Sequence, residues 1–194
     1  MEPHVIILNG PAGVGKSTVG RALAALAPNG VCIHGDDLRA FIVTRQPGAT
    51  AGGTTYTIGA TVAAGFLAAG YGRVVFEFVF EQPTFVTRFR DAYAATGAVA
   101  PVSLYTLWAS LEVTTEREAT RAYRDRVGGN LGERVAACHR TMAAHLDQLG
   151  VIVENVGQSA DETAQRIHLL HEEGATRIGS ATDADSEAAQ TRPR

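Results

Sequence analysis

The chain has 194 residues, 45% of them hydrophobic and 19% charged, a composition that suits one compact domain with a substantial core. Its formal net charge of -3 gives no broad basic surface, so a polymeric nucleic-acid partner is not expected. The two cysteines, Cys32 and Cys138, indicate buried thiols in a reducing compartment rather than a disulfide framework.

The first apolar run of the chain begins directly after Met1 to His4. No basic segment precedes this run, and it is far too short to cross a bilayer. We therefore expect a cytoplasmic protein without a membrane partner.

Short apolar runs then alternate with longer helical patterns along the chain. This alternation is typical of an α/β protein whose parallel sheet is covered by helices. Five strands are predicted, at Val5–Leu8, Val31–His34, Arg73–Phe80, Val102–Trp108 and Val151–Glu154. The predicted helices cover residues 16–27, 36–44, 54–69, 82–95, 111–127, 131–149 and 160–173.

A phosphate-binding motif follows the first strand. Residues 10–18 match G-x-x-x-x-G-K-[ST] between a strand and a helix, as a P-loop requires. Glycines let the backbone wrap a polyphosphate, and the helix N-terminus favours the anion. Together with the strand pattern, the motif predicts a three-layer α/β/α P-loop NTPase fold with a five-stranded parallel sheet and a helical lid. The residues expected to bind ATP are Gly10, Ala12, Gly13, Val14, Gly15, Lys16, Ser17 and Thr18.

Lys16 is the only lysine in a chain whose other basic side chains are arginines. A slender point charge that fits between phosphates is poorly replaced by a planar guanidinium, so its retention indicates a geometric demand. We expect Lys16 to reach the β- and γ-phosphates and Ser17 to bind Mg²⁺.

Two carboxylates follow the second strand, at Asp36 and Asp37. At the carboxyl edge of the sheet they would meet the phosphoryl acceptor, and Asp36 is our candidate base. Alternatively, one of them caps the helix that follows. Arg39 is expected to bind an anionic group of the acceptor or to pair with an acid. His34 is interpreted as structural.

The third predicted strand is apolar except for Glu77, and a buried carboxylate needs a partner. Glu77 is a candidate second group of the metal site, with an arginine ion pair as the alternative. Glu81, just beyond the strand, is an alternative for the metal role because the register is uncertain by a residue or two.

The helix predicted at 111–127 carries three arginines on one face. Like charges at this spacing oppose helix formation unless something anionic compensates them. We interpret residues 111–130 as a lid that closes over the phosphates, with Gly128 and Gly129 as its hinge. A solvated charged face is the alternative. The arginines concerned are Arg117, Arg121 and Arg124.

Three other segments have predicted roles. Residues 46–53 are interpreted as a small-residue loop, either a second lid or a connector. The loop at 155–159 is a candidate for binding the adenine base of ATP. Residues 1–173 are expected to form a single domain, and 174–194 a disordered tail, because apolar periodicity ends near Gly174.

The order of these motifs resembles the adenylate-kinase-like P-loop kinases over about residues 4–173. The segments 5–10 and 35–36 look most similar to chloramphenicol phosphotransferase-like kinases, with zeta-toxin-type kinases a more distant match through 36–39. The resemblance implies ATP with Mg²⁺, Asp36 as the base and lid arginines on the phosphates. It departs at Glu77, where related chains often carry Asp, so this longer acid is expected to act through water.

The leading functional hypothesis is phosphorylation of a hydroxyl on a small molecule, such as an antibiotic or another natural product. A nucleoside or nucleotide kinase is a second hypothesis, in which Arg39, Arg88 and Arg90 bind a monophosphate. A nucleotide-dependent switch is a third, although the sequence has no N-K-x-D segment. The acceptor and the oligomeric state remain open.

Overall fold

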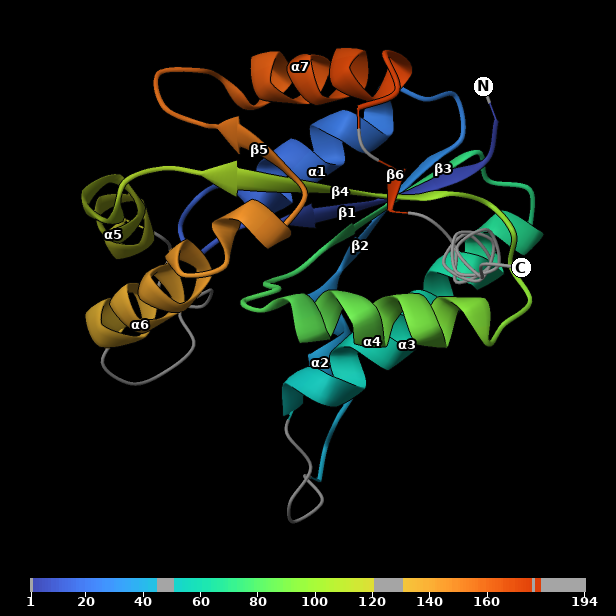
Figure 1. Ribbon diagram of the computed structural model, residues 1–194, viewed down its shortest axis with the longest axis horizontal. Helices are drawn as coiled ribbons and strands as arrows, with labels where there is room; N and C mark the ends of the chain where they lie inside the picture. Colours follow the sequence, from blue (N-terminus) through green and yellow to red (C-terminus); the bar gives the residue numbers. More distant parts are fainter. Residues whose placement is uncertain (1, 45–50, 121–130, 176, 179–194) are drawn as a thin grey trace, which may run out of the picture.

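The computed structural model describes residues 2–44, 51–120, 131–175 and 177–178. Five parallel strands form its sheet in the order β2-β3-β1-β4-β5 (Figure 1). The strands are β1 (His4–Asn9), β2 (Gly30–His34), β3 (Arg73–Glu77), β4 (Val102–Trp108) and β5 (Val151–Glu154). The predicted five-stranded parallel sheet is therefore confirmed.

Helices cover both faces of this sheet. In Figure 1, α1 and α7 lie over one face and α3 and α4 over the other, while α5 and α6 pack together past the carboxyl end of β4. The three-layer α/β/α arrangement is confirmed. The helices are α1 (Lys16–Ala25), α2 (Gly35–Ala40), α3 (Ala51–Ala68), α4 (Pro83–Ala94), α5 (Leu111–Ala119), α6 (Leu131–Ala143) and α7 (Ala160–Glu172), with a 3-10 turn at Leu146–Gln148.

Strand β1 shows why the sequence folds into layers. Its side chains from Val5 to Leu8 have no exposed surface and alternate between two hydrophobic clusters. Val5 and Ile7 belong to the cluster that contains residues of α3 and α4, whereas Ile6 and Leu8 belong to the cluster that contains residues of α1 and α7. A central parallel strand is buried on both sides, which explains its unbroken apolar sequence.

Five predicted boundaries are wrong. The helix predicted at 36–44 ends at Ala40, and the one predicted at 111–127 ends at Ala119. Strand β3 ends at Glu77 and not at Phe80. The segment predicted as a loop at 46–53 belongs to α3 from Ala51 onward, while 46–50 lie outside the described residues. The helix predicted at 131–149 ends at Ala143 and is followed by the separate 3-10 turn.

A short sixth strand was not predicted. β6 (Arg177–Ile178) pairs antiparallel with Val102 and Ser103 at the start of β4, so the segment interpreted as a tail contributes two residues to the sheet. Within the described part of the chain, no helix is both long enough and apolar enough to span a bilayer.

Candidate nucleotide and acceptor site

The P-loop between β1 and α1 has the backbone shape that phosphate binding requires. Gly10, Gly13 and Gly15 have φ angles of 147°, 79° and 100°, a region that other residues rarely adopt. Gly15 is the N-cap of α1 and carries no side chain to cap the helix. The first N–H groups of α1 therefore suit an anionic ligand.

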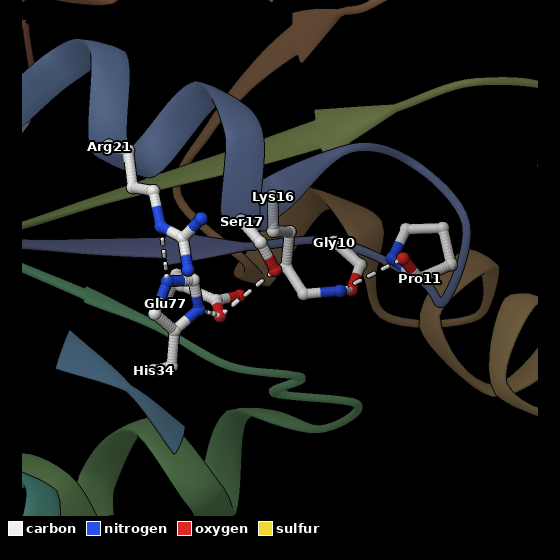
Figure 2. A network of polar contacts seen from close by, with 7 residues as sticks. All are labelled: Gly10, Pro11, Lys16, Ser17, Arg21, His34 and Glu77. Carbon is white, nitrogen blue, oxygen red and sulfur yellow. Dashed lines mark hydrogen bonds and ion pairs between the residues drawn. The ribbon is translucent and has the colours of Figure 1, made fainter. Parts of the chain in front are cut away.

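Lys16 lies inside the curve of this loop. Its Nζ donates to the carbonyl oxygens of Gly10 and Pro11 at 2.9 and 3.0 Å, as Figure 2 shows. The ammonium group is thus held against the first two residues of the loop. The side chain of Val14 is buried in the core, so only its backbone is available to a nucleotide, whereas Thr18 is exposed.

The P-loop is tied to the sheet through Asn9, a residue to which sequence reasoning gave no role. Its Oδ1 accepts from the backbone N–H of Gly10 and Phe80 at 2.7 and 2.8 Å. Its Nδ2 donates to the Phe80 carbonyl and to Thr106 Oγ1, both at 3.1 Å. These bonds satisfy the backbone of Phe80, which lies beyond the end of β3.

Helix α5 is seated directly on the P-loop. A Cβ added to Gly13 would lie 2.2 Å from the carbonyl oxygen of Thr114, so the two backbones are in close contact. Arg117 of α5 donates to the Val14 carbonyl at 3.3 Å. The part of the predicted lid that the structure describes therefore lies beside the phosphate loop. Arg121 and Arg124 lie outside the described residues.

The Val14 carbonyl also accepts from Asn155 Nδ2, at 2.6 Å. Asn155 is buried, and its Oδ1 accepts from the Thr163 hydroxyl at 3.0 Å. The amide of Asn155 is thus engaged by the P-loop and by α7. The loop that follows β5 consequently supports the phosphate loop, a role that its sequence did not indicate.

A chain of four side chains joins the start of α1 to the ends of β2 and β3 (Figure 2). Ser17 Oγ donates to Glu77 Oε1 at 3.2 Å, and the same oxygen accepts from His34 Nδ1. Arg21 Nε donates to His34 Nε2 at 3.1 Å. Glu77 is only 5% exposed, so its charge requires these donors.

His34 was interpreted as structural, but it is the direct partner of Glu77. The two residues face each other in the β2–β3 register. Among the described residues, the ion-pair partner of Glu77 is His34, and Arg21 contacts the imidazole instead. The hydrogen bond to Glu77 raises the pKa of His34, although partial burial opposes the shift. Recognising this pair from sequence would have required the strand order.

The Ser17 hydroxyl and the Glu77 carboxylate fit the chemistry of Mg²⁺, which prefers hard oxygen ligands. Across the residues that the structure describes, no group of three or more His, Cys, Asp and Glu could hold a metal ion by itself. Such a pair suits Mg²⁺ that is also held by nucleotide phosphates and water. Burial is the largest cause that raises the pKa of Cys138 to about 11, and Glu81 raises it further, whereas Lys16 and the backbone of Ala12 lower it. Glu81 thus also lies near the P-loop and remains the alternative acid for the metal.

Asp36 and Asp37 lie in the first turn of α2, at the carboxyl edge of the sheet, and both are exposed. The N-cap of α2 is His34, so the alternative that one of the two acids caps this helix is wrong. Arg39 Nη1 donates to Asp36 Oδ1 at 3.4 Å. A carboxylate paired with an arginine thus stands two residues from the Glu77 network.

Comparison with known proteins agrees with this geometry. Residues 5–149 match a family model described as AAA domain, which covers more than half of the chain. No curated protein matches the chain significantly.

Several solved structures share the fold. The tunicamycin resistance protein of Deinococcus radiodurans has a TM-score of 0.61 at 16% identity, covering 92% of this chain and 99% of its own. Shikimate kinase from Acinetobacter baumannii, solved with shikimate, has a TM-score of 0.60 at 20% identity, with coverages of 89% and 94%. A gluconokinase from Sinorhizobium meliloti has a TM-score of 0.57 at 17% identity and covers 98% of both chains. At these identities the likeness shows the fold alone.

Proposed function

Because the chain belongs to the AAA domain family, we propose that it is an ATP-dependent phosphotransferase that moves the γ-phosphoryl group to a hydroxyl of a small molecule. One observation carries the proposal. The P-loop lysine, a serine bound to a buried glutamate, and an exposed aspartate come together at one edge of the sheet. These are the groups that phosphoryl transfer to a hydroxyl requires.

Each group has a role in the proposed reaction. Backbone N–H groups of the P-loop and Lys16 bind the phosphates, while Ser17 and Glu77 would hold Mg²⁺. When bound, this ion neutralises phosphate charge. Asp36 accepts the proton of the acceptor hydroxyl while the hydroxyl oxygen bonds to the γ-phosphorus. The bond between this phosphorus and the β–γ bridging oxygen breaks, and ADP leaves. Arg117, with Arg121 and Arg124 as candidates beyond the described residues, would balance the charge of the transferring group.

The fold neighbours support a small acceptor. Two of them are named as kinases of shikimate and gluconate, and a third as a tunicamycin resistance protein. We infer that the acceptor here is likewise a small hydroxylated molecule, with natural products and antibiotics among the candidates. The closer similarity to chloramphenicol phosphotransferase-like kinases remains a prediction, since these matches do not single out that subgroup.

A second candidate is a kinase whose acceptor is anionic, such as a nucleotide. Tyr56 of α3 lies near charged groups from several elements. Burial and Glu81 raise the pKa of its phenol, whereas Arg39 of α2 and Arg88 of α4 lower it. Two arginines that both act on Tyr56 would suit a phosphate or carboxylate on the acceptor.

The test is to measure ADP release from ATP and Mg²⁺ with hydroxylated antibiotics, nucleosides, nucleotides, sugars and hydroxy acids, recording product mass. A product heavier by one phosphoryl group supports the proposal and identifies the acceptor class. Lys16→Ala is the matched control and should abolish that product. ATP binding without any phosphorylated product across the panel would count against a kinase and favour a nucleotide-dependent switch.

A further inference from the structure

The link between Arg21, His34 and Glu77 ends on the oxygen that Ser17 also contacts. Glu77 Oε1 accepts from both Ser17 Oγ and His34 Nδ1. We propose that His34, held by Arg21, is a positioning residue that fixes the Glu77 carboxylate beside Ser17, so that these two oxygens are presented together to Mg²⁺. This inference rests on the proposed function, because it assumes that Ser17 and Glu77 bind the metal.

The hydrogen bonds define how the imidazole is oriented. Arg21 Nε–H donates to His34 Nε2, and His34 Nδ1 faces Glu77 Oε1 from the other side of the ring. Arg21 thereby holds the plane of the ring that contacts Glu77, as outer partners of metal-binding groups commonly do.

An imidazole suits this position better than an arginine would. A guanidinium bound directly to Glu77 would place a full positive charge on the carboxylate and compete with Mg²⁺ for it. In the observed arrangement the imidazole separates Arg21 from Glu77 (Figure 2). The carboxylate is therefore oriented by a hydrogen bond while its charge remains available to a cation.

A long acid gains most from such a partner. Glutamate has one more rotatable bond than aspartate, so fixing its carboxylate costs more side-chain entropy. The groups that hold Glu77 come from regular elements. Ser17 and Arg21 are one turn apart on α1, and His34 lies opposite Glu77 in the β2–β3 register.

Gly20 brings α1 close to this part of the sheet. A Cβ added at Gly20 would lie 3.1 Å from Cys32 Sγ and 3.6 Å from Glu77 Cβ. The helix can therefore approach the strands closely enough for Ser17 and Arg21 to reach Glu77 and His34. Rigid elements of this kind hold a site more precisely than loops do.

The test compares ATP affinity with Mg²⁺ and with EDTA, by isothermal titration calorimetry, so that no acceptor is needed. In His34→Leu and Arg21→Leu we expect Mg²⁺-dependent affinity to fall about tenfold while affinity in EDTA stays within about twofold. His34→Asn, whose amide can donate to Glu77, should recover most of the loss. Arg166→Leu, an exposed arginine on α7, is the matched control.

The outcomes separate this inference from the proposed function. If both His34→Leu and Arg21→Leu lose affinity equally in Mg²⁺ and in EDTA, the link between Arg21, His34 and Glu77 is only structural and the inference is wrong. Unchanged affinities in both variants would also overturn it. If the unsubstituted protein binds ATP equally with and without Mg²⁺, the metal site itself is wrong, and the proposed function loses its basis as well. Arg21 is exposed, so its substitution should leave folding intact.

Discussion

Asn9 is a single polar side chain on which the position of the P-loop depends. It is fully buried, and it bonds to the first residue of the loop, to Phe80 beyond the end of β3, and to Thr106 of β4. Buried amides are costly unless all their groups are satisfied, and Asn9 uses both its oxygen and its nitrogen. The P-loop therefore starts from a point fixed to two neighbouring strands.

Replacing Asn9 with Ala should be strongly destabilising. The backbone groups of Gly10 and Phe80 would lose their partners inside the core, so we expect the free energy of unfolding to fall by about 3 kcal/mol. Urea denaturation would measure this change. Asn29→Ala, at an exposed position, is the control and should change stability by less than about 0.5 kcal/mol. Equal effects of the two substitutions would contradict the role given to Asn9.

The two acids at the start of α2 allow a matched test of the base. Asp36→Asn should lower turnover about a hundredfold or more with the true acceptor, because a proton acceptor is lost. The dissociation constant of ATP should stay within about twofold, since the carboxylate does not bind nucleotide. Asp37→Asn, its exposed neighbour, should retain most activity. If Asp37→Asn is the more damaging substitution, Asp37 is the base.

Between elements, α5 makes a close contact with the P-loop. Gly13 lies against the Thr114 carbonyl, and Arg117 and Asn155 both donate to the Val14 carbonyl. The loop is thus enclosed by β1, α5 and the segment after β5. A phosphate loop held on three sides is preorganised for its ligand.

Gly13→Ala tests this contact. The new methyl group would overlap the Thr114 carbonyl, and a φ of 79° is unfavourable for Ala. We expect ATP affinity to fall at least about tenfold and stability to fall by about 2 kcal/mol. Gly65→Ala is the matched control, because it lies in α3 with open space around it and should stabilise the helix slightly. Normal ATP binding by Gly13→Ala would show that α5 can be displaced without cost.

Local patterns carried most of the fold prediction. Strands and helices followed from apolar periodicity, and residues 10–18 were recognisable because the G-x-x-x-x-G-K-[ST] spacing directly reflects phosphate geometry. The backbone contacts of Phe80 were not predictable, because they are made by Asn9 from a distant part of the chain. The His34–Glu77 pair likewise needed the knowledge that β2 lies next to β3. Long-range contacts are what a single sequence leaves undetermined.

At the scale of the whole molecule, burial affects several ionisable groups. It is the largest cause raising the pKa of Cys32 to about 12 and of Cys138 to about 11. Tyr93 and Tyr105 are raised to about 12 for the same reason. These thiols and phenols remain neutral in the folded protein at pH values where they ionise in the unfolded chain.

Stability should therefore decline in alkali. Above about pH 9 the unfolded chain loses protons that the folded protein retains, so the free energy of unfolding falls as pH rises. The decline approaches about 1.4 kcal/mol per pH unit for each fully affected group. Urea denaturation at about pH 7.5, 9 and 10.5 would measure it, and Cys32→Ala should make the slope shallower. A slope unchanged by this substitution would mean that the Cys32 thiol titrates normally.

The central position of β1 also affects how the chain folds while it is being synthesised. β1 pairs with β3 and β4, so it has no backbone partner in this sheet until residues 73–77 and 102–108 have also been synthesised. At about 5–20 residues per second, this wait lasts on the order of 5–20 s. During that time the fully apolar segment Val5–Leu8 is unpaired on the nascent chain, where exposed apolar surface favours aggregation.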